Sequence, residues 1–171
     1  GEPRLAILPF VAAGQGLLAL WAWHLLKWEP TGERVVIEGV TQAIFPGRFA
    51  PEAITPFLIL SAILAAVHFL AGLAEERRTA RPLPWAALAA TVPVLALLIA
   101  YARVRGFAID MGWAFAALAL AGVLTATATL AAKEGSGQRA GTHAAGAMAA
   151  LALAFAMVLR DQWLTLAISM L

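Results

Sequence analysis

The stretch PFLILSAILAAVHFLAGLA, residues 56–74, contains no charged side chain and is rich in Leu, Ala and Ile. An α-helix rises about 1.5 Å per residue, and the hydrocarbon core of a bilayer is about 30 Å thick. About 20 such residues therefore form one membrane crossing. Other stretches of similar length and composition follow one another along the chain. The pattern predicts an all-α, polytopic transmembrane helix bundle with five complete spans plus the start of a sixth.

The composition agrees with this class of protein. Hydrophobic residues make up 62% of the chain and charged residues 13%, whereas ordinary soluble domains carry about 25% charged residues. We expect residues 1–171 to be a single membrane-embedded segment of a longer protein, because the chain opens on Gly1 and ends inside an apolar stretch. The expected spans are residues 5–26, 56–74, 83–102, 111–132, 142–159 and 163–171.

Aromatic residues gather near the ends of these spans, where amphipathic rings prefer the headgroup level. The expected interface anchors are Trp21, Trp23, Trp28, Trp85, Tyr101, Trp113 and Trp163. Most connections are short, which forces neighbouring spans to pack antiparallel. The Arg77, Arg78 and Arg81 cluster favours a cytoplasmic position for its turn.

The connection at residues 27–55 is longer and rich in Pro and Gly. We expect an extramembrane loop, with a short strand at residues 35–37 and a segment along the membrane surface at residues 40–45. The connection at residues 133–141, KEGSGQRAG, is expected to be a flexible polar turn.

Two polar side chains lie inside expected spans and are candidate functional groups. His68 stands between Val67 and Phe69, and an ionisable group at membrane depth is costly. It either serves a substrate path or, as a neutral ring, bonds a backbone carbonyl. Gln15 lies between Gly14 and Gly16 and either contacts a substrate or bonds another helix.

Other features are expected to be structural. Thr125, Thr127 and Thr129 can bond carbonyls one turn earlier. The rows Ala117, Ala121, Thr125 and Gly146, Ala150, Ala154 permit close helix packing. Pro93 is expected to kink its span, which either shapes the bundle or marks a cavity.

The charged residues near the span ends are expected to be structural and not catalytic or metal-binding. Asp110 precedes a span as a helix cap, and Glu75 and Glu76 beside Arg77 and Arg78 are expected to form a solvated charge cluster. His24 and His143 share no face with His68, so we expect no metal site. There is no Cys, no set of catalytic residues, no cofactor motif and no basic tract suited to nucleic acid. We therefore favour a role other than that of an enzyme.

The end of the chain is similar to a known family. An Ala-rich span, then Arg160, Asp161 and Gln162, then WLTLA at residues 163–167, resembles a recurring element of large bacterial membrane proteins of unknown function, the DUF2339 family. The resemblance is sharpest over residues 151–171. It implies many Ala/Leu-rich helices in a longer chain and supplies no activity, cofactor or catalytic residue.

Three functions remain open. The first is a helical scaffold in the bacterial inner (cytoplasmic) membrane, with membrane lipid and the remaining helices of the full-length chain as partners. The second is a transporter or channel module with a polar path near His68, Gln15 and the Pro93 kink. The third is a membrane-embedded transferase for lipid-linked substrates that uses acids of the 27–55 loop, namely Glu29, Glu33, Glu38 and Glu52.

Overall fold

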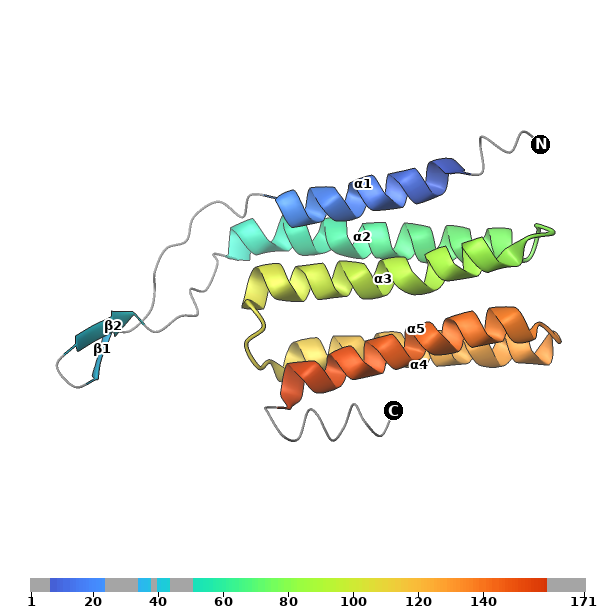
Figure 1. The fold of residues 1–171 in the computed structure, drawn as a ribbon. Helices are drawn as coiled ribbons and strands as arrows, with labels where there is room; N and C mark the ends of the chain where they lie inside the picture. The colour runs from blue at the N-terminus through green and yellow to red at the C-terminus, as the bar shows by residue number, and fades with distance from the viewer. Residues whose placement is uncertain (1–6, 24–33, 38–39, 44–50, 160–171) are drawn as a thin grey trace.

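The computed structural model describes residues 7–23, 34–37, 40–43 and 51–159. Within these ranges the helices run alternately up and down (Figure 1). They are α1 (Leu8–Ala22), α2 (Pro51–Glu76), α3 (Pro82–Arg105), α4 (Met111–Lys133) and α5 (Gly137–Val158). Between α1 and α2, strands β1 (Arg34–Ile37) and β2 (Val40–Ala43) pair antiparallel, with Arg34 opposite Ala43.

The long helices confirm the predicted class of fold. Four helices of the described residues are long and apolar enough to cross a membrane: α2 from Ile54, and the whole of α3, α4 and α5. The first expected span, residues 5–26, is different. Helix α1 has 15 residues, which corresponds to about 22 Å and is shorter than the hydrocarbon core. The described residues therefore contain four full-length spans and one short apolar helix, and the span expected at residues 163–171 lies outside them.

The end of α1 coincides with a contact from α3. The backbone of Trp23 leaves the helical conformation, with φ −56° and ψ 118°. The Trp23 carbonyl then accepts a hydrogen bond from Arg103 Nη2 at 2.6 Å. Since the last carbonyls of a helix lack partners within the helix, this bond from α3 stabilises the chain where it departs from α1.

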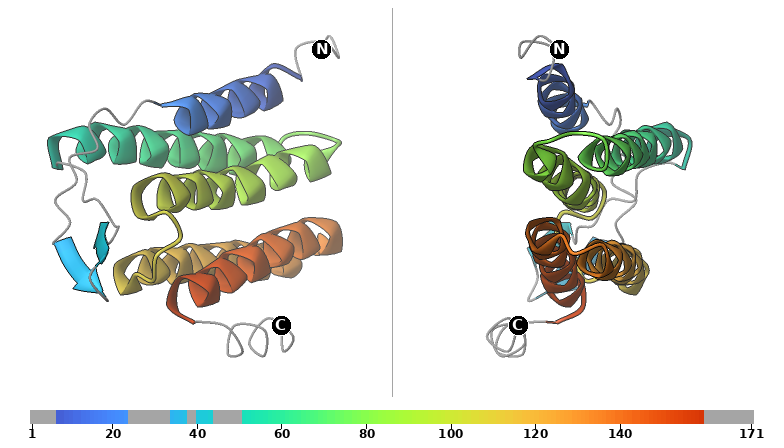
Figure 2. Two further views of the ribbon diagram at one scale, coloured as in Figure 1. Left: turned by 60° about the vertical axis from the view of Figure 1, so that its left-hand side comes forward. Right: turned by 90° about the vertical axis from the view of Figure 1, so that its right-hand side faces the viewer.

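Helix α3 is the centre of the bundle and packs against all four other helices. Figure 2 shows α1 and α2 on one side of it and the α4–α5 pair on the other. Two glycines permit the closest approaches. A Cβ on Gly72 would lie 2.8 Å from the Trp85 carbonyl oxygen of α3, and one on Gly146 would lie 2.9 Å from the Ala90 Cβ atom.

The small-residue rows pack as the sequence predicts, except at Thr125, which is exposed. Ala117 and Ala121 of α4 are buried, and so are Ala150 and Ala154 of α5. The threonines of α4 also behave as expected, because Thr125, Thr127 and Thr129 each donate to a carbonyl three or four residues earlier. Their hydroxyls are satisfied within their own helix.

Several element boundaries correct the sequence prediction. Helix α2 begins at Pro51 and so includes Pro56. Residues 34–37 form the expected strand, and residues 40–43 form its antiparallel partner strand. Most of the expected flexible turn after Lys133 is helical, because α5 begins at Gly137. Gly135, with φ +77°, makes the reversal in so few residues.

Candidate functional site

Four side chains form a bonded network, here called the ionic cluster, at the end of the bundle where α2 ends and α5 begins. Glu76 Oε1 accepts a hydrogen bond from Arg139 Nη2 at 2.9 Å, and Glu76 Oε2 lies 2.9 Å from His143 Nε2. Arg139 Nη1 donates to Glu134 Oε2, also at 2.9 Å. Arg77 extends the network at its exposed edge, 3.5 Å from Glu134. The cluster joins α2 to the α4–α5 hairpin.

The spacing along α5 explains how the cluster forms. Arg139 and His143 are four residues apart, so both side chains leave the same face of the helix. Glu76 is the last residue of α2, and Arg139 lies in the first turn of α5. A carboxylate at a helix C-terminus and a cation at a helix N-terminus are each unfavourable toward their own helix dipole. Their mutual bonds therefore account for their positions, and local helix preference does not.

Burial distinguishes the cluster from ordinary surface charges. The side chain of Glu76 is 1% exposed, that of Arg139 10% and that of His143 0%. The neighbouring Glu75–Arg78 pair is solvated, at 3.7 Å with 42% and 75% exposure. The sequence prediction of a solvated charge cluster thus holds for Glu75 and is wrong for Glu76, whose carboxylate points into the bundle and not into water.

The hydrogen-bond roles in the cluster follow from its chemistry. A carboxylate only accepts, so His143 Nε2 carries the hydrogen in its bond to Glu76. His143 Nδ1 is buried and has no partner among the described residues. In the ionic cluster, therefore, Arg139 and His143 Nε2 donate hydrogen bonds and the carboxylates of Glu76 and Glu134 accept them.

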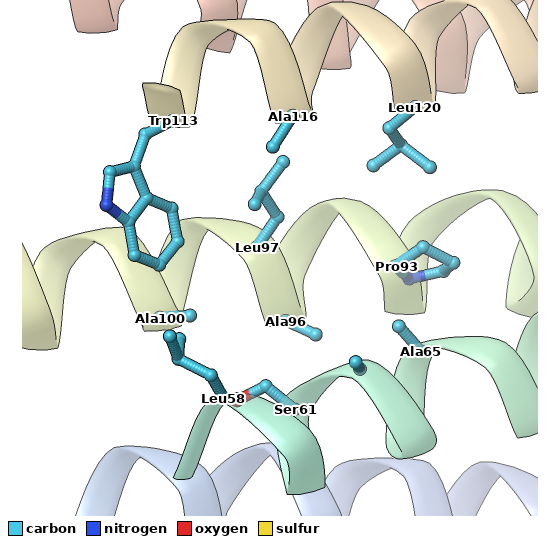
Figure 3. A pocket seen from close by; sticks show the side chains of 11 residues that line it. Leu58, Ser61, Ala65, Pro93, Ala96, Leu97, Ala100, Trp113, Ala116 and Leu120 are labelled. Carbon is cyan, nitrogen blue, oxygen red and sulfur yellow. The ribbon is translucent and has the colours of Figure 1, made fainter. Parts of the chain in front are cut away.

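A second feature is an apolar groove of about 220 Å³ between α2 and α4, with α3 between them (Figure 3). Helices α2 and α4 do not pack against each other, which leaves this space open. Most of its lining is Ala and Leu, with Pro93, Trp113 and Ser61 added. The Ser61 hydroxyl is buried and has no hydrogen-bond partner among the described residues. No member of the ionic cluster lines the groove.

The structure does not bring the predicted polar candidates together. His68 is half-buried on α2, and its Nδ1 lies 2.9 Å from the Leu64 carbonyl oxygen of the same helix. Gln15 is exposed on α1. Pro93 lines the groove, whereas neither Gln15 nor His68 does.

The predicted interface anchors have different surroundings. Trp21 and Trp23 are exposed, and the Trp85 ring packs on Phe10 with ring centroids 5.6 Å apart. Tyr101 is 1% exposed and donates to the Ala108 carbonyl at 2.9 Å, so its ring is part of the core. Trp28 and Trp163 lie outside the described residues, as does His24.

The sequence does not predict the ionic cluster. Its pattern predicts a flexible turn at Arg139 and a solvated position for Glu76, and not their pairing across 63 residues. The available signal was the spacing of Arg139 and His143 on one face of an otherwise apolar helix. Among the described residues, no group of three or more His, Asp or Glu side chains has a geometry suited to a metal ion.

Long apolar helices around a buried ionic cluster define a polytopic helical membrane protein. The chain belongs to the DUF2339 family of predicted membrane proteins, whose model matches residues 5–171. No curated protein and no solved structure matches the chain.

Proposed function

We propose that this chain is a helical scaffold segment in the inner membrane of a bacterium. Its role is to hold helices in a fixed arrangement for the remaining helices of the full-length chain. One observation carries the proposal: the buried ionisable groups of the ionic cluster, Glu76, Arg139 and His143, bond one another and join α2 to α5. Buried polar bonds that connect distant helices are suited to fixing one packing arrangement.

The groove supports the same proposal. A transport path needs polar groups that replace the water around a moving solute. The groove between α2 and α4 offers a single side-chain hydroxyl, that of Ser61, in a lining of apolar residues. The charged side chains that could serve such a path are instead held in the ionic cluster at one end of the bundle.

A transporter or channel module is the second candidate, and one observation favours it. Ser61 is buried, has no hydrogen-bond partner in the described part of the chain, and lines the same groove as Pro93. A proline inside a spanning helix leaves a carbonyl without its usual N–H donor. The Ser61 hydroxyl and the Pro93 ring line the same space. The acids proposed for a transferase, by contrast, lie in residues whose side chains the structure does not describe.

Cysteine reactivity separates the two candidates. The native chain has no Cys, so Ser61→Cys introduces a single thiol into the groove. The scaffold predicts that a charged, membrane-impermeant thiosulfonate reagent leaves this thiol unmodified in vesicles, while Ala80→Cys in the exposed α2–α3 turn reacts. Rapid modification of Ser61→Cys, together with a solute flux that the modification blocks, would contradict the scaffold proposal and support the transporter proposal.

A further inference from the structure

A second hollow, here called the headgroup hollow, lies where α1 begins and the α2–α3 turn ends. Figure 1 shows these two segments at the same end of the bundle. Its volume is about 510 Å³. It has an apolar wall and a polar rim. Its lining residues are Ile7, Phe10, Thr79, Ala80, Arg81, Pro84 and Trp85.

The polar rim holds a cation that has no partner among the described residues. Arg81 is exposed, and its backbone N–H is bound to Thr79 Oγ1 at 3.3 Å, while its guanidinium bonds no described residue. Every other arginine whose side chain the structure describes bonds a carboxylate or a carbonyl. These arginines are Arg77, Arg78, Arg103, Arg105 and Arg139.

No described carboxylate is available to Arg81. Those whose side chains the structure describes are all engaged by other groups: Glu75, Glu76, Asp110 and Glu134. Among the described residues at this end of the bundle, five basic side chains stand against three acidic ones, an excess of positive charge. The basic residues are Arg77, Arg78, Arg81, Lys133 and Arg139, and the acidic residues are Glu75, Glu76 and Glu134.

The N-terminus of α3 adds to the positive electrostatic potential beside Arg81. Helix α3 begins directly after Arg81, with no side-chain cap and no acidic residue in its first turn. The positive end of its dipole is therefore not compensated locally. An anion placed beside Arg81 would meet both the guanidinium and this helix end.

The apolar wall adds a second requirement to the occupant. Phe10 of α1 and Trp85 of α3 pack with ring centroids 5.6 Å apart and continue into the buried contact of Ala13 with Leu88 and Val92. A Trp beside an arginine at the end of a spanning helix is typical of headgroup depth. The occupant needs a negative charge at the rim and an apolar portion along the two helices.

We propose that the headgroup hollow binds an anionic phospholipid. Arg81 bonds the phosphate, and the first segment of an acyl chain lies against Phe10 and Trp85. A lipid satisfies both requirements from within the membrane, whereas inorganic phosphate satisfies only the first. Charge complementarity with the free guanidinium selects anionic over zwitterionic headgroups.

The test uses the full chain in nanodiscs of phosphatidylcholine that contain a titrated fraction of brominated phosphatidylglycerol. Bromine quenches a nearby Trp, and the Trp85 signal is the difference between the chain and its Trp85→Phe variant. We expect quenching of Trp85 to saturate at a low fraction of phosphatidylglycerol. Arg81→Gln should shift the midpoint about tenfold higher, since a charge-assisted hydrogen bond is lost.

Matched variants make the result specific. Arg78→Gln removes a charge from the same turn, but Arg78 is already paired with Glu75 and does not line the hollow. It should change the midpoint less than about twofold, the small effect of an exposed charge. Arg81→Lys should keep most of the preference for phosphatidylglycerol.

Three outcomes would overturn the proposal. The first is an equal shift for Arg81→Gln and Arg78→Gln, which would indicate a general charge effect. The second is the same quenching by brominated phosphatidylcholine. The third is full competition by inorganic phosphate, which would identify a site for free anions and not for lipid. Because Arg81 bonds no described side chain, circular dichroism should give the same helical signal for the native chain, Arg81→Gln and Arg81→Lys.

Discussion

Removing the Glu76 carboxylate should be the most destabilising single change in the ionic cluster. Glu76→Ala deletes two bonds at once, one to Arg139 and one to His143, each 2.9 Å long. Arg139 keeps its bond to Glu134, whereas His143 Nε2 loses its partner in a fully buried position. Removing one partner of a buried charged pair costs about 3–5 kcal/mol.

We expect the free energy of unfolding to fall by about 3 kcal/mol, the lower end of that range, because Arg139 remains paired. Glu75→Ala is the matched control, since the solvated pair with Arg78 at 3.7 Å contributes about 0.5 kcal/mol. The assay is reversible unfolding of the full chain in mixed micelles by sodium dodecyl sulfate, followed by circular dichroism. If the two variants lower the free energy of unfolding equally, the ionic cluster does not hold α2 to α5.

Three further changes test other contacts. Gly72→Ala should destabilise the chain by about 1–3 kcal/mol, the range for overpacking, because its Cβ would lie 2.8 Å from an α3 carbonyl oxygen. Gly122→Ala is the control, since a Cβ on Gly122 would meet nothing within 4 Å. An equal loss in the free energy of unfolding for Gly122→Ala would contradict this prediction. Asp110→Ala removes a carboxylate that caps two N–H groups of α4 and should lower the free energy of unfolding by about 1 kcal/mol in the same assay. His68→Leu should leave insertion and stability nearly unchanged, because the one bond of its ring to the described residues is to the Leu64 carbonyl of its own helix. A large loss of folded protein would show that the ring has another partner.

The sequence predicts those features of the fold that depend on local patterns. The helices α2 to α5 follow from apolar length, the cap at Asp110 from its position, and the hydroxyl bonds of Thr125 from its own helix. These features need no knowledge of tertiary structure, because their partners lie within a few residues.

The ionic cluster could not be predicted by the same reasoning. Glu76 and His143 are 67 residues apart, and each lies beside charged or polar residues that make a solvated end plausible. Which carboxylate turns inward depends on how α2 meets α5 across α3. Glu75 and Glu76 are adjacent in α2 and therefore point to different faces of the helix, so that Glu75 is solvated and Glu76 is buried.

The length of α1 also depends on a distant residue. The apolar pattern continues to Leu26, yet the described helix ends at Ala22, where Arg103 of α3 binds the Trp23 carbonyl. Apolar composition alone carries no information about such a contact between helices. The groove has the same origin, because it exists only where α2 and α4 fail to meet over α3.

The alternating course of α2 to α5 across the membrane is the central claim of this account, and labelling of single cysteines in intact vesicles tests it most directly. Ala80 and Gln138 are exposed near the turns at one end of the bundle, and Ile109 is exposed in the turn at the other. The account predicts that Ala80→Cys and Gln138→Cys react with an impermeant maleimide from the same side, and Ile109→Cys only from the opposite side. Labelling of Ala80→Cys and Ile109→Cys from one side would mean that α3 does not cross the membrane, and the account would be wrong.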